Sequence, residues 1–232
     1  MTSFIKHVIN SLKKRPIGLD GTANKVSPQN RKVLNVGGGS KAISIPAQYN
    51  GWEHFLLDID PKAKPDVVCD ARKLTDLPGA EFDSVYCSHN LEHYYRHDVP
   101  KVLTGFLHIL KEDGFAYIRV PDMGSLMEFV TEYGMDITDV YYQSPAGPIT
   151  FLDVIYGYGK EIESSGNDYY AHKTGFTQKS LKAALLNAGF GNVFINVEEL
   201  ELTAIAFKNL PVTHITTLLN LGVNTQAAHK TG

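Results

Sequence analysis

Short apolar runs alternate with turn residues and one clear helical pattern between residues 31 and 120. Such runs indicate buried strands, and residues 99–110 place their apolar positions at the spacing of a helix face. The strand-like runs read KVLNV, HFLLDI, DVVC, SVYCS and FAYIRV. Strands that alternate with helices predict right-handed crossovers and a mostly parallel sheet.

The pattern changes after residue 120. Residues 123–173 hold two helical segments, several turn clusters and seven tyrosines, and they predict a helical insertion that covers the carboxyl edge of the sheet. Gln178 to Ala188 predicts a helix that ends at Gly189. Residues 192–207 read as two strands joined by a tight turn. With the five earlier runs they predict a doubly wound, seven-stranded α/β sheet that ends in an antiparallel hairpin.

The two ends of the chain contain few residues that suggest a function. Residues 1–30 predict an amphipathic helix, Met1–Arg15, followed by a loop, and the tail from Leu210 contains one short helical pattern, ITTLLNL. The 232 residues predict one domain. Prolines, glycines and polar residues dominate the remaining terminal stretches.

Composition narrows the classes of function. The chain is 43% hydrophobic and 20% charged, with a net charge of −3, which gives no electrostatic case for nucleic acid as a partner. Cys69 and Cys87 lie in apolar runs and read as buried thiols rather than a disulfide framework. No apolar run approaches the ~20 residues of a membrane span, and no secretory signal pattern opens the sequence. We therefore expect a cytoplasmic protein.

Three strand ends carry the residues that suggest a ligand. The first run stops in Gly37-Gly38-Gly39, where bare backbone allows a sharp turn and close approach of a ligand. Asp58 ends the second run about 20 residues later, the spacing at which a carboxylate reaches a ribose. Asp70 ends the third. The three ends predict a nucleoside cofactor lying across the carboxyl edge of the sheet.

The stretches GGGS, LDIDP, CDARKLTDLP and FDSVYCSHNLEH, in this order, resemble those of class I S-adenosylmethionine (SAM) methyltransferases. The likeness is greatest to a predicted bacterial branch linked to cell-surface glycan assembly. It implies that SAM is the cofactor, that Asp58 binds the ribose hydroxyls and that Asp70, beside Ala71, binds the adenine amino group. Asn35 stands where the family usually has an acidic residue. The implied cofactor-binding positions are Asn35, Gly37, Gly38, Gly39, Asp58, Ile59, Asp70, Ala71, Ser88 and His89.

The resemblance implies in-line transfer of a methyl group to a hydroxyl or amine of a small-molecule or glycan acceptor. A hydroxyl would need a general base, and His89, His93 and His172 are the candidates, in falling order of expected closeness to the methyl group. Three histidines spaced by four (His89, His93 and His97), with Glu92 nearby, also suggest a metal site. Because a sulfonium methyl donor needs no metal, we expect none.

Other residues leave alternatives open. Asp122 could cap a helix or line the acceptor pocket. The tyrosine-rich insertion, with Asn167, Asp168, His172 and Lys173, is the best acceptor-pocket candidate. There is no NPPY-like tetrapeptide near residues 88–92, which argues against amino-methylation of nucleic acid or glutamine.

Two rival functions deserve comparison. The glycine spacing, with Tyr156 and Lys160 four residues apart, also fits a short-chain NAD(P)-dependent dehydrogenase, but Pro46 interrupts the helix that a pyrophosphate would need. The neutral Asn35 favours a non-catalytic SAM-fold binding module.

Overall fold

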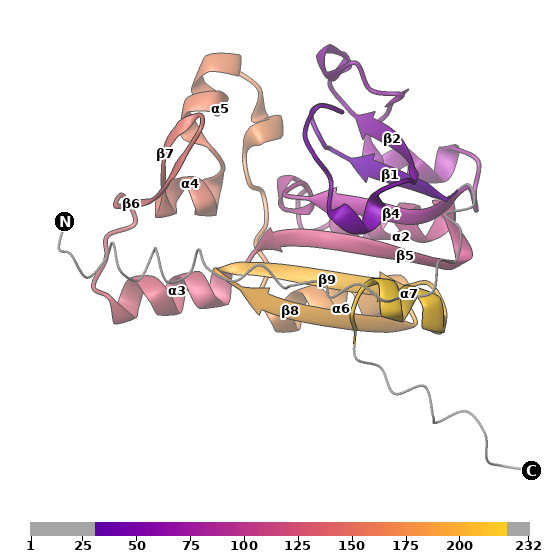
Figure 1. Ribbon diagram of the computed structural model, residues 1–232. Coiled ribbons are helices and arrows are strands. Elements are labelled where there is room, and N and C mark those ends of the chain that lie inside the picture. Colours follow the sequence, from indigo (N-terminus) through magenta and orange to yellow (C-terminus); the bar gives the residue numbers. More distant parts are fainter. Residues whose placement is uncertain (1–30, 222–232) are drawn as a thin grey trace, which may run out of the picture.

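The computed structural model describes residues 31–221 of the chain. Its main sheet has seven strands in the order β3-β2-β1-β4-β5-β9-β8, so the predicted doubly wound fold with a terminal hairpin is confirmed (Figure 1). The strands are β1 (Lys32–Val36), β2 (Glu53–Asp58), β3 (Val67–Val68), β4 (Phe82–Ser88), β5 (Leu110–Pro121), β8 (Asn192–Glu198) and β9 (Glu201–Phe207). The first five pair in parallel, and β9 pairs antiparallel with both β5 and β8.

Helices and short 3-10 turns connect the strands. The α-helices are α2 (Val99–Ile109), α3 (Met123–Glu132), α4 (Phe151–Tyr156), α5 (Gly159–Ser165), α6 (Gln178–Ala188) and α7 (Thr213–Leu218). The 3-10 turns are η1 (Ala47–Tyr49), η2 (Pro61–Ala63), η3 (Ala71–Asp76), η4 (Leu91–His93) and η5 (Asp168–Tyr170). Only η1 follows the glycine turn, in keeping with the interruption by Pro46. No helix within residues 31–221 is long and apolar enough to cross a membrane.

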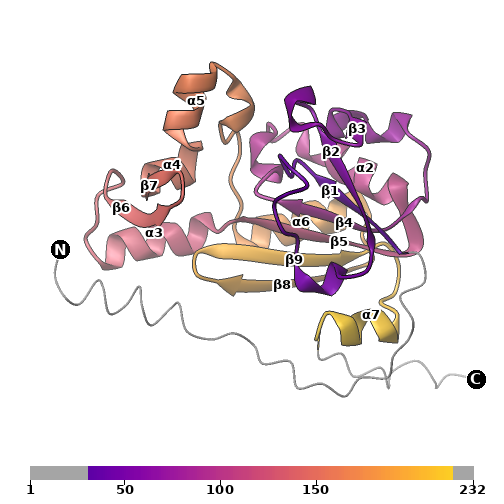
Figure 2. The ribbon, with the colours of Figure 1, turned by 45° about the horizontal axis from the view of Figure 1, so that its top comes forward.

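Both faces of the sheet are buried. On one face α2 and α6 pack with η3, and their fully buried side chains include Phe106, Leu185 and Leu74. On the other face a smaller cluster gathers around Phe115 and Phe207 and is closed by η1 and α7, which Figure 2 shows across the sheet from α2 and α6. Two-sided burial explains why the parallel strands read as nearly continuous apolar runs.

Residues 123–173, called the insertion from here on, stand as a separate lobe beyond the end of β5 (Figure 1). The predicted helices are present, but the second is broken into α4 and α5 at Gly157, whose φ is 94°. The turn-rich stretch between α3 and α4 forms a small hairpin, β6 (Val140–Ser144) with β7 (Gly147–Thr150), which the sequence pattern did not predict. The predicted Met1–Arg15 helix and 16–30 loop lie outside the described residues.

Candidate functional site

The turn after β1 contains glycine positions that leave no space for a side chain. Gly37 and Gly39 have φ of 69° and 65°. A Cβ at Gly37 would lie 2.0 Å from Nδ2 of Asn90, and one at Gly38 would lie 2.2 Å from Nδ2 of Asn35. The two asparagine side chains therefore press directly on the glycine backbone, and this is the steric reason for the glycines.

Asp58, at the end of β2, ties the second strand to this turn. Its Oδ2 accepts a hydrogen bond from the Gly39 N–H at 3.1 Å, and its Oδ1 accepts one from the Asp60 N–H at 2.9 Å. A carboxylate has about four acceptor positions, so each oxygen retains capacity for a further donor. The two hydrogen bonds therefore fix the carboxylate and leave it able to accept further hydrogen bonds from a pair of hydroxyl groups.

A cavity of about 930 Å³ opens at the carboxyl ends of β1, β2 and β4. Eight of the ten predicted cofactor positions line it: Asn35, Gly37, Gly38, Gly39, Asp58, Ile59, Ser88 and His89. Tyr169 and Tyr170 of the insertion close it from the other side. In an open α/β sheet, ligands bind outside the carboxyl ends of the strands, where this cavity lies.

The remaining two predicted cofactor positions lie beside this cavity. Ala71 is buried, and Asp70 lines an adjoining hollow of about 150 Å³. Asp70 accepts hydrogen bonds from the backbone N–H of Arg72 at 3.0 Å and from its side-chain Nε at 2.9 Å. Burial would raise the pKa of Asp70, but these bonds outweigh it and lower the pKa. The Asp70 carboxylate is thus already shared with a cation, and its contact with adenine stays a prediction.

The first cavity contains a buried acceptor to which no described residue donates a hydrogen bond, and we use this acceptor to ask whether the cavity fits SAM. The Oδ1 atom of Asn90 is buried and has no hydrogen-bond partner among the described residues. Asn90 lines the cavity beside Asn35, and an amide oxygen is an acceptor for an ammonium group. With the glycine cradle and Asp58, this acceptor suits the amino-acid and ribose parts of SAM. Asn90 was not among the predicted positions, although it lies inside the HNLEH stretch.

His89 is held as a cation by two glutamates. Its Nε2 lies 2.8 Å from Oε2 of Glu201, and its Nδ1 lies 3.5 Å from Oε1 of Glu92. Burial would lower the pKa of His89, but the two carboxylates outweigh it and raise the pKa to about 9. Arg119 also donates to Glu201, at 2.8 Å, and so fixes this carboxylate. A histidine that is protonated at neutral pH cannot accept a proton, so the first-ranked base is unsuited to that role.

His93 and His172 pack edge to face, with ring centroids 4.8 Å apart. The two nitrogens of His93 each lie 3.1 Å from a carbonyl oxygen, one of Ala171 and one of His89. His172 donates from Nδ1 to the Val154 carbonyl at 2.9 Å, and its Nε2 lies 4.0 Å from Oε1 of Glu92. Burial lowers the pKa of His172 against the opposing effect of Glu92, so this ring is neutral.

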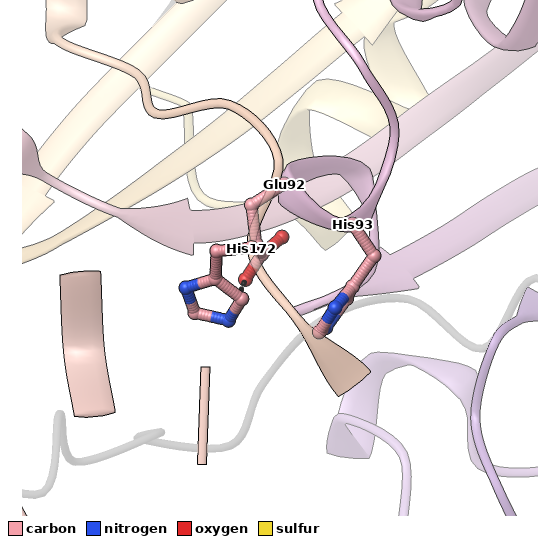
Figure 3. Close-up of side chains that lie close together, drawn as sticks. All are labelled: Glu92, His93 and His172. Carbon is pink, nitrogen blue, oxygen red and sulfur yellow. Dashed lines mark ion pairs between the residues drawn. The ribbon is translucent and has the colours of Figure 1, made fainter. Parts of the chain in front are cut away.

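Glu92, His93 and His172 form one cluster, called the Glu92 cluster below (Figure 3). It differs from the predicted metal set, because residues 89–97 are not an α-helix and do not align their histidines on one face. His97 is not part of the cluster, and its side chain is 75% exposed. No sequence spacing connects His172 to Glu92; the insertion brings it there.

A second cavity, of about 480 Å³, meets the first at His89, which lines both. The insertion supplies much of its wall, including Tyr141, Tyr142, Tyr158 and His172. Of the other predicted acceptor-pocket residues, Asn167 lines the first cavity, whereas Asp168 and Lys173 line the hollow beside Asp70.

The open alternative for Asp122 is resolved by its contacts. Its carboxylate accepts hydrogen bonds from the Gly124 N–H at 2.9 Å and from the Ser125 hydroxyl at 2.7 Å. Asp122 is buried and caps α3, so it is a structural residue.

Comparison with known proteins agrees with this geometry. A family profile described as a methyltransferase domain matches residues 19–194. A SAM-dependent methyltransferase from Archaeoglobus fulgidus shares 17% identity over 89% of this chain and 92% of its own, with a TM-score of 0.50. A SAM-dependent methyltransferase from Methanosarcina mazei shares 15% over 78% and 93%, with a TM-score of 0.51. The PH0226 protein from Pyrococcus horikoshii shares 16% over 79% and 84%, with a TM-score of 0.52. No curated protein matches the sequence.

The sheet order and the cavity at the strand ends define a class I SAM-dependent methyltransferase. The chain belongs to the methyltransferase-domain family, whose profile spans most of its length. SAM is its cofactor, and the enzyme is a transferase rather than a dehydrogenase. Tyr156, which the dehydrogenase reading needed, is 61% exposed and is separated from α5 by the break at Gly157.

Proposed function

We propose that this enzyme methylates a hydroxyl or amine group of a ring-bearing small molecule or glycan, which binds in the second cavity. The observation that carries this proposal is the contact of the two cavities at His89. Methyl transfer needs donor and acceptor in line, and two adjoining cavities with one shared wall can hold both. When bound, SAM supplies a methyl group on a positively charged sulfur.

In this proposal the first cavity is the SAM site. The Gly37–Gly39 backbone and Ser88 contact the methionine part, Asn35 and Asn90 accept from its ammonium group, and Asp58 binds the ribose hydroxyls. The charge usually supplied at the position of Asn35 is absent, but Asn90 adds a buried acceptor nearby. These assignments rest on the cavity wall and on the acceptors that the protein itself leaves free.

The wall of the second cavity suits a ring with hydroxyl groups. Tyr141 donates its hydroxyl to the Glu199 carbonyl at 3.0 Å, and Tyr158 donates its own to Ala146 at 2.9 Å. These bonds fix both rings, whose faces can stack on the apolar face of a sugar or another ring. Glu199, Glu201 and His89 line the same wall, and Glu201 is already paired with His89 and Arg119, so the wall presents groups of both charges to an acceptor.

The insertion acts as the cover of the acceptor side in this proposal. It contributes Tyr142 and His172 to the second cavity and Tyr169 and Tyr170 to the first, so it touches both reactants. Residues 171–174, where the insertion ends and the chain returns to the core, are called the strap. The strap is pinned to the core by hydrogen bonds from Lys173 and Thr174 N–H groups to the Glu92 carbonyl, at 2.8 and 3.2 Å.

Removal of the acceptor's proton falls to the Glu92 cluster rather than to His89. The cation at His89 instead places a fixed positive charge at the wall between the cavities. His172 is neutral and lines the second cavity, which makes it the best placed of the three predicted histidines.

The test is turnover of SAM labelled in the methyl group, with a panel of sugar nucleotides, oligosaccharides and small amines. We expect label in one acceptor class and formation of S-adenosylhomocysteine, and calorimetry should show binding of SAM but not of NAD(P). A protein that binds S-adenosylhomocysteine yet never consumes SAM with any cell extract would instead be a binding module.

A further inference from the structure

The carboxylate of Glu92 is buried without the contacts that a buried carboxylate needs. Glu92 is 1% exposed, and across residues 31–221 neither of its oxygens has a hydrogen-bond partner. The nitrogens of His89 and His172 lie 3.5 and 4.0 Å away. Both distances exceed the 2.7–2.9 Å of a charge-assisted hydrogen bond. Because a buried carboxylate that accepts no hydrogen bond is costly even beside a charged histidine, a further partner is expected here.

His172 has the geometry of a metal ligand. Its Nδ1–H donates to the Val154 carbonyl at 2.9 Å, so the lone pair is on Nε2. Figure 3 shows the ring beside the carboxylate of Glu92. In a metal-binding histidine, the ring nitrogen that does not bind the metal usually donates its N–H to a nearby acceptor such as a backbone carbonyl. This hydrogen bond fixes the tautomer and the orientation of the ring.

His93 contacts two carbonyl oxygens, and it offers a nitrogen to an ion when one of these contacts is given up. Each of its two nitrogens lies 3.1 Å from a carbonyl oxygen. An imidazole ring binds a metal through a nitrogen that carries a lone pair, while its other nitrogen can keep an N–H for one of the carbonyls. Because a zinc–nitrogen bond alone is about 2.0 Å long, an ion has no room between that nitrogen and the carbonyl oxygen, so His93 would bind it by turning its ring away from the carbonyl.

We propose that Glu92, His93 and His172 bind one divalent transition-metal ion of the zinc type. Their ligand atoms all lie within 4.8 Å of one another. Zinc bonds of about 2.0–2.2 Å require ligand atoms about 3.3 Å apart, a spacing that rotation of these side chains can reach. Two imidazoles and one carboxylate favour zinc and its transition-metal neighbours over magnesium or calcium, which prefer oxygen ligands.

The ion would join two parts of the molecule. Glu92 and His93 belong to η4 in the core, and His172 belongs to the strap. Three protein ligands leave at least one position open, and His172 lines the second cavity. There the ion would polarise an acceptor oxygen and ease loss of its proton. This role rests on the proposed function, whereas binding of the ion does not.

The site revises the expectation of metal independence for a physical reason. A sulfonium needs no metal to release its methyl group, but that argument concerns only the donor. His172 of the Glu92 cluster lines the second cavity, where in the proposed function a hydroxyl must become a nucleophile.

The experiment measures metal directly, on full-length protein purified without a polyhistidine tag. After chelation and dialysis, the chain is titrated with Zn²⁺ and with Co²⁺, whose visible absorption reports coordination by nitrogen. We expect one ion per chain and cobalt bands that zinc displaces. Glu92→Gln and His172→Asn should each weaken binding more than about 100-fold, beyond the 10–100-fold that outer contacts cost.

His97→Gln is the matched control, because this exposed histidine lies near the site but outside the cluster. It should bind both ions as the unaltered chain does. Binding of S-adenosylhomocysteine shows that each variant is folded, and His172→Asn keeps the test valid if Glu92→Gln does not fold. A folded chain without saturable uptake of either ion overturns the proposal, as does uptake that survives both cluster variants. No acceptor is present, so neither result bears on methyl transfer itself.

Discussion

The first cavity is lined mainly by residues at and after the ends of β1, β2 and β4, with the 161–170 part of the insertion opposite, whereas the second is lined mainly by the insertion and the β8–β9 turn. The strands behind the first cavity contribute fully buried side chains such as Val33, Leu56 and Val85, whereas the insertion buries only a few large apolar side chains, among them Leu126 and Phe151. Several of its tyrosines stay exposed, Tyr142 at 45% and Tyr169 at 48%. A site with a rigid half and a looser half can hold its cofactor firmly and still admit different acceptors.

We expect the largest loss of SAM binding when the glycine backbone of the first cavity is altered. Gly37→Ala should abolish measurable SAM binding, a loss of more than about 100-fold. The added Cβ collides with the Asn90 amide, and the left-handed conformation costs a further ~1–2 kcal/mol. Calorimetry gives the affinity and thermal unfolding gives the stability.

Gly134→Ala provides the control for that substitution. Gly134 has φ of 58°, but a Cβ there meets nothing within 4 Å. It should lose about 1 kcal/mol of stability and no affinity for SAM. Equal SAM affinity in the two variants would show that the glycine turn does not contact the cofactor.

Substitution of Asp58 measures what a side chain contributes to SAM binding in the first cavity. Asp58→Ala should weaken SAM binding by about 10- to 100-fold, since hydrogen bonds to a charged acceptor contribute about 1.5–3 kcal/mol each before water competes. Asp58→Asn keeps the shape of the side chain and one acceptor oxygen, so its affinity for SAM should lie between those of the unaltered chain and Asp58→Ala. If a folded Asp58→Ala chain binds SAM normally in calorimetry, the end of β2 has been given the wrong role.

The looser half should separate acceptor binding from cofactor binding. Tyr142→Ala removes an aromatic face from the second cavity and should raise the KM for the acceptor about 5- to 10-fold, as expected for the loss of about 1 kcal/mol of ring contact. The affinity for SAM should not change. Tyr156→Ala, which removes an exposed ring of the same insertion that lines neither cavity, should change neither quantity. A changed SAM affinity in Tyr142→Ala alone would place this ring on the cofactor side.

The same division explains what the sequence could predict. A mostly parallel sheet and the meeting of Gly37–Gly39 with Asp58 follow from apolar runs and strand ends, because parallel strands bring their carboxyl ends to one edge whatever lies outside them. The resemblance to a known family added the rest of the cavity wall, such as Asn35 and His89. The Glu92 cluster could not be found in this way. Glu92 and His93 are adjacent, but His172 reaches them only through the packing of the insertion, and spacing in the sequence says nothing of that.

The turn chemistry of the insertion was also ambiguous. The stretch from Ser144 to Gly147 reads as a loop, yet it closes the β6–β7 hairpin, in which the Ser144 hydroxyl donates to the Gly147 carbonyl at 2.9 Å. Strands this short carry too little alternation to be distinguished from a loop.

The smallest expected effect concerns motion, and it tests whether the two halves act together. Hydrogen exchange with and without S-adenosylhomocysteine should show slower exchange around Gly37 and Asp58, and a weaker slowing in residues 164–173. That segment contributes Tyr169 and Tyr170 to the first cavity, so a bound cofactor gives it contacts that it otherwise lacks. The β6–β7 hairpin touches only the second cavity and serves as the internal reference, with no expected change. Slower exchange across the whole insertion would mean that the lobe closes as one body when the cofactor binds. Protection confined to the strand ends would mean that the insertion responds to the acceptor alone, and the cover proposed for residues 123–173 would then have no part in holding SAM.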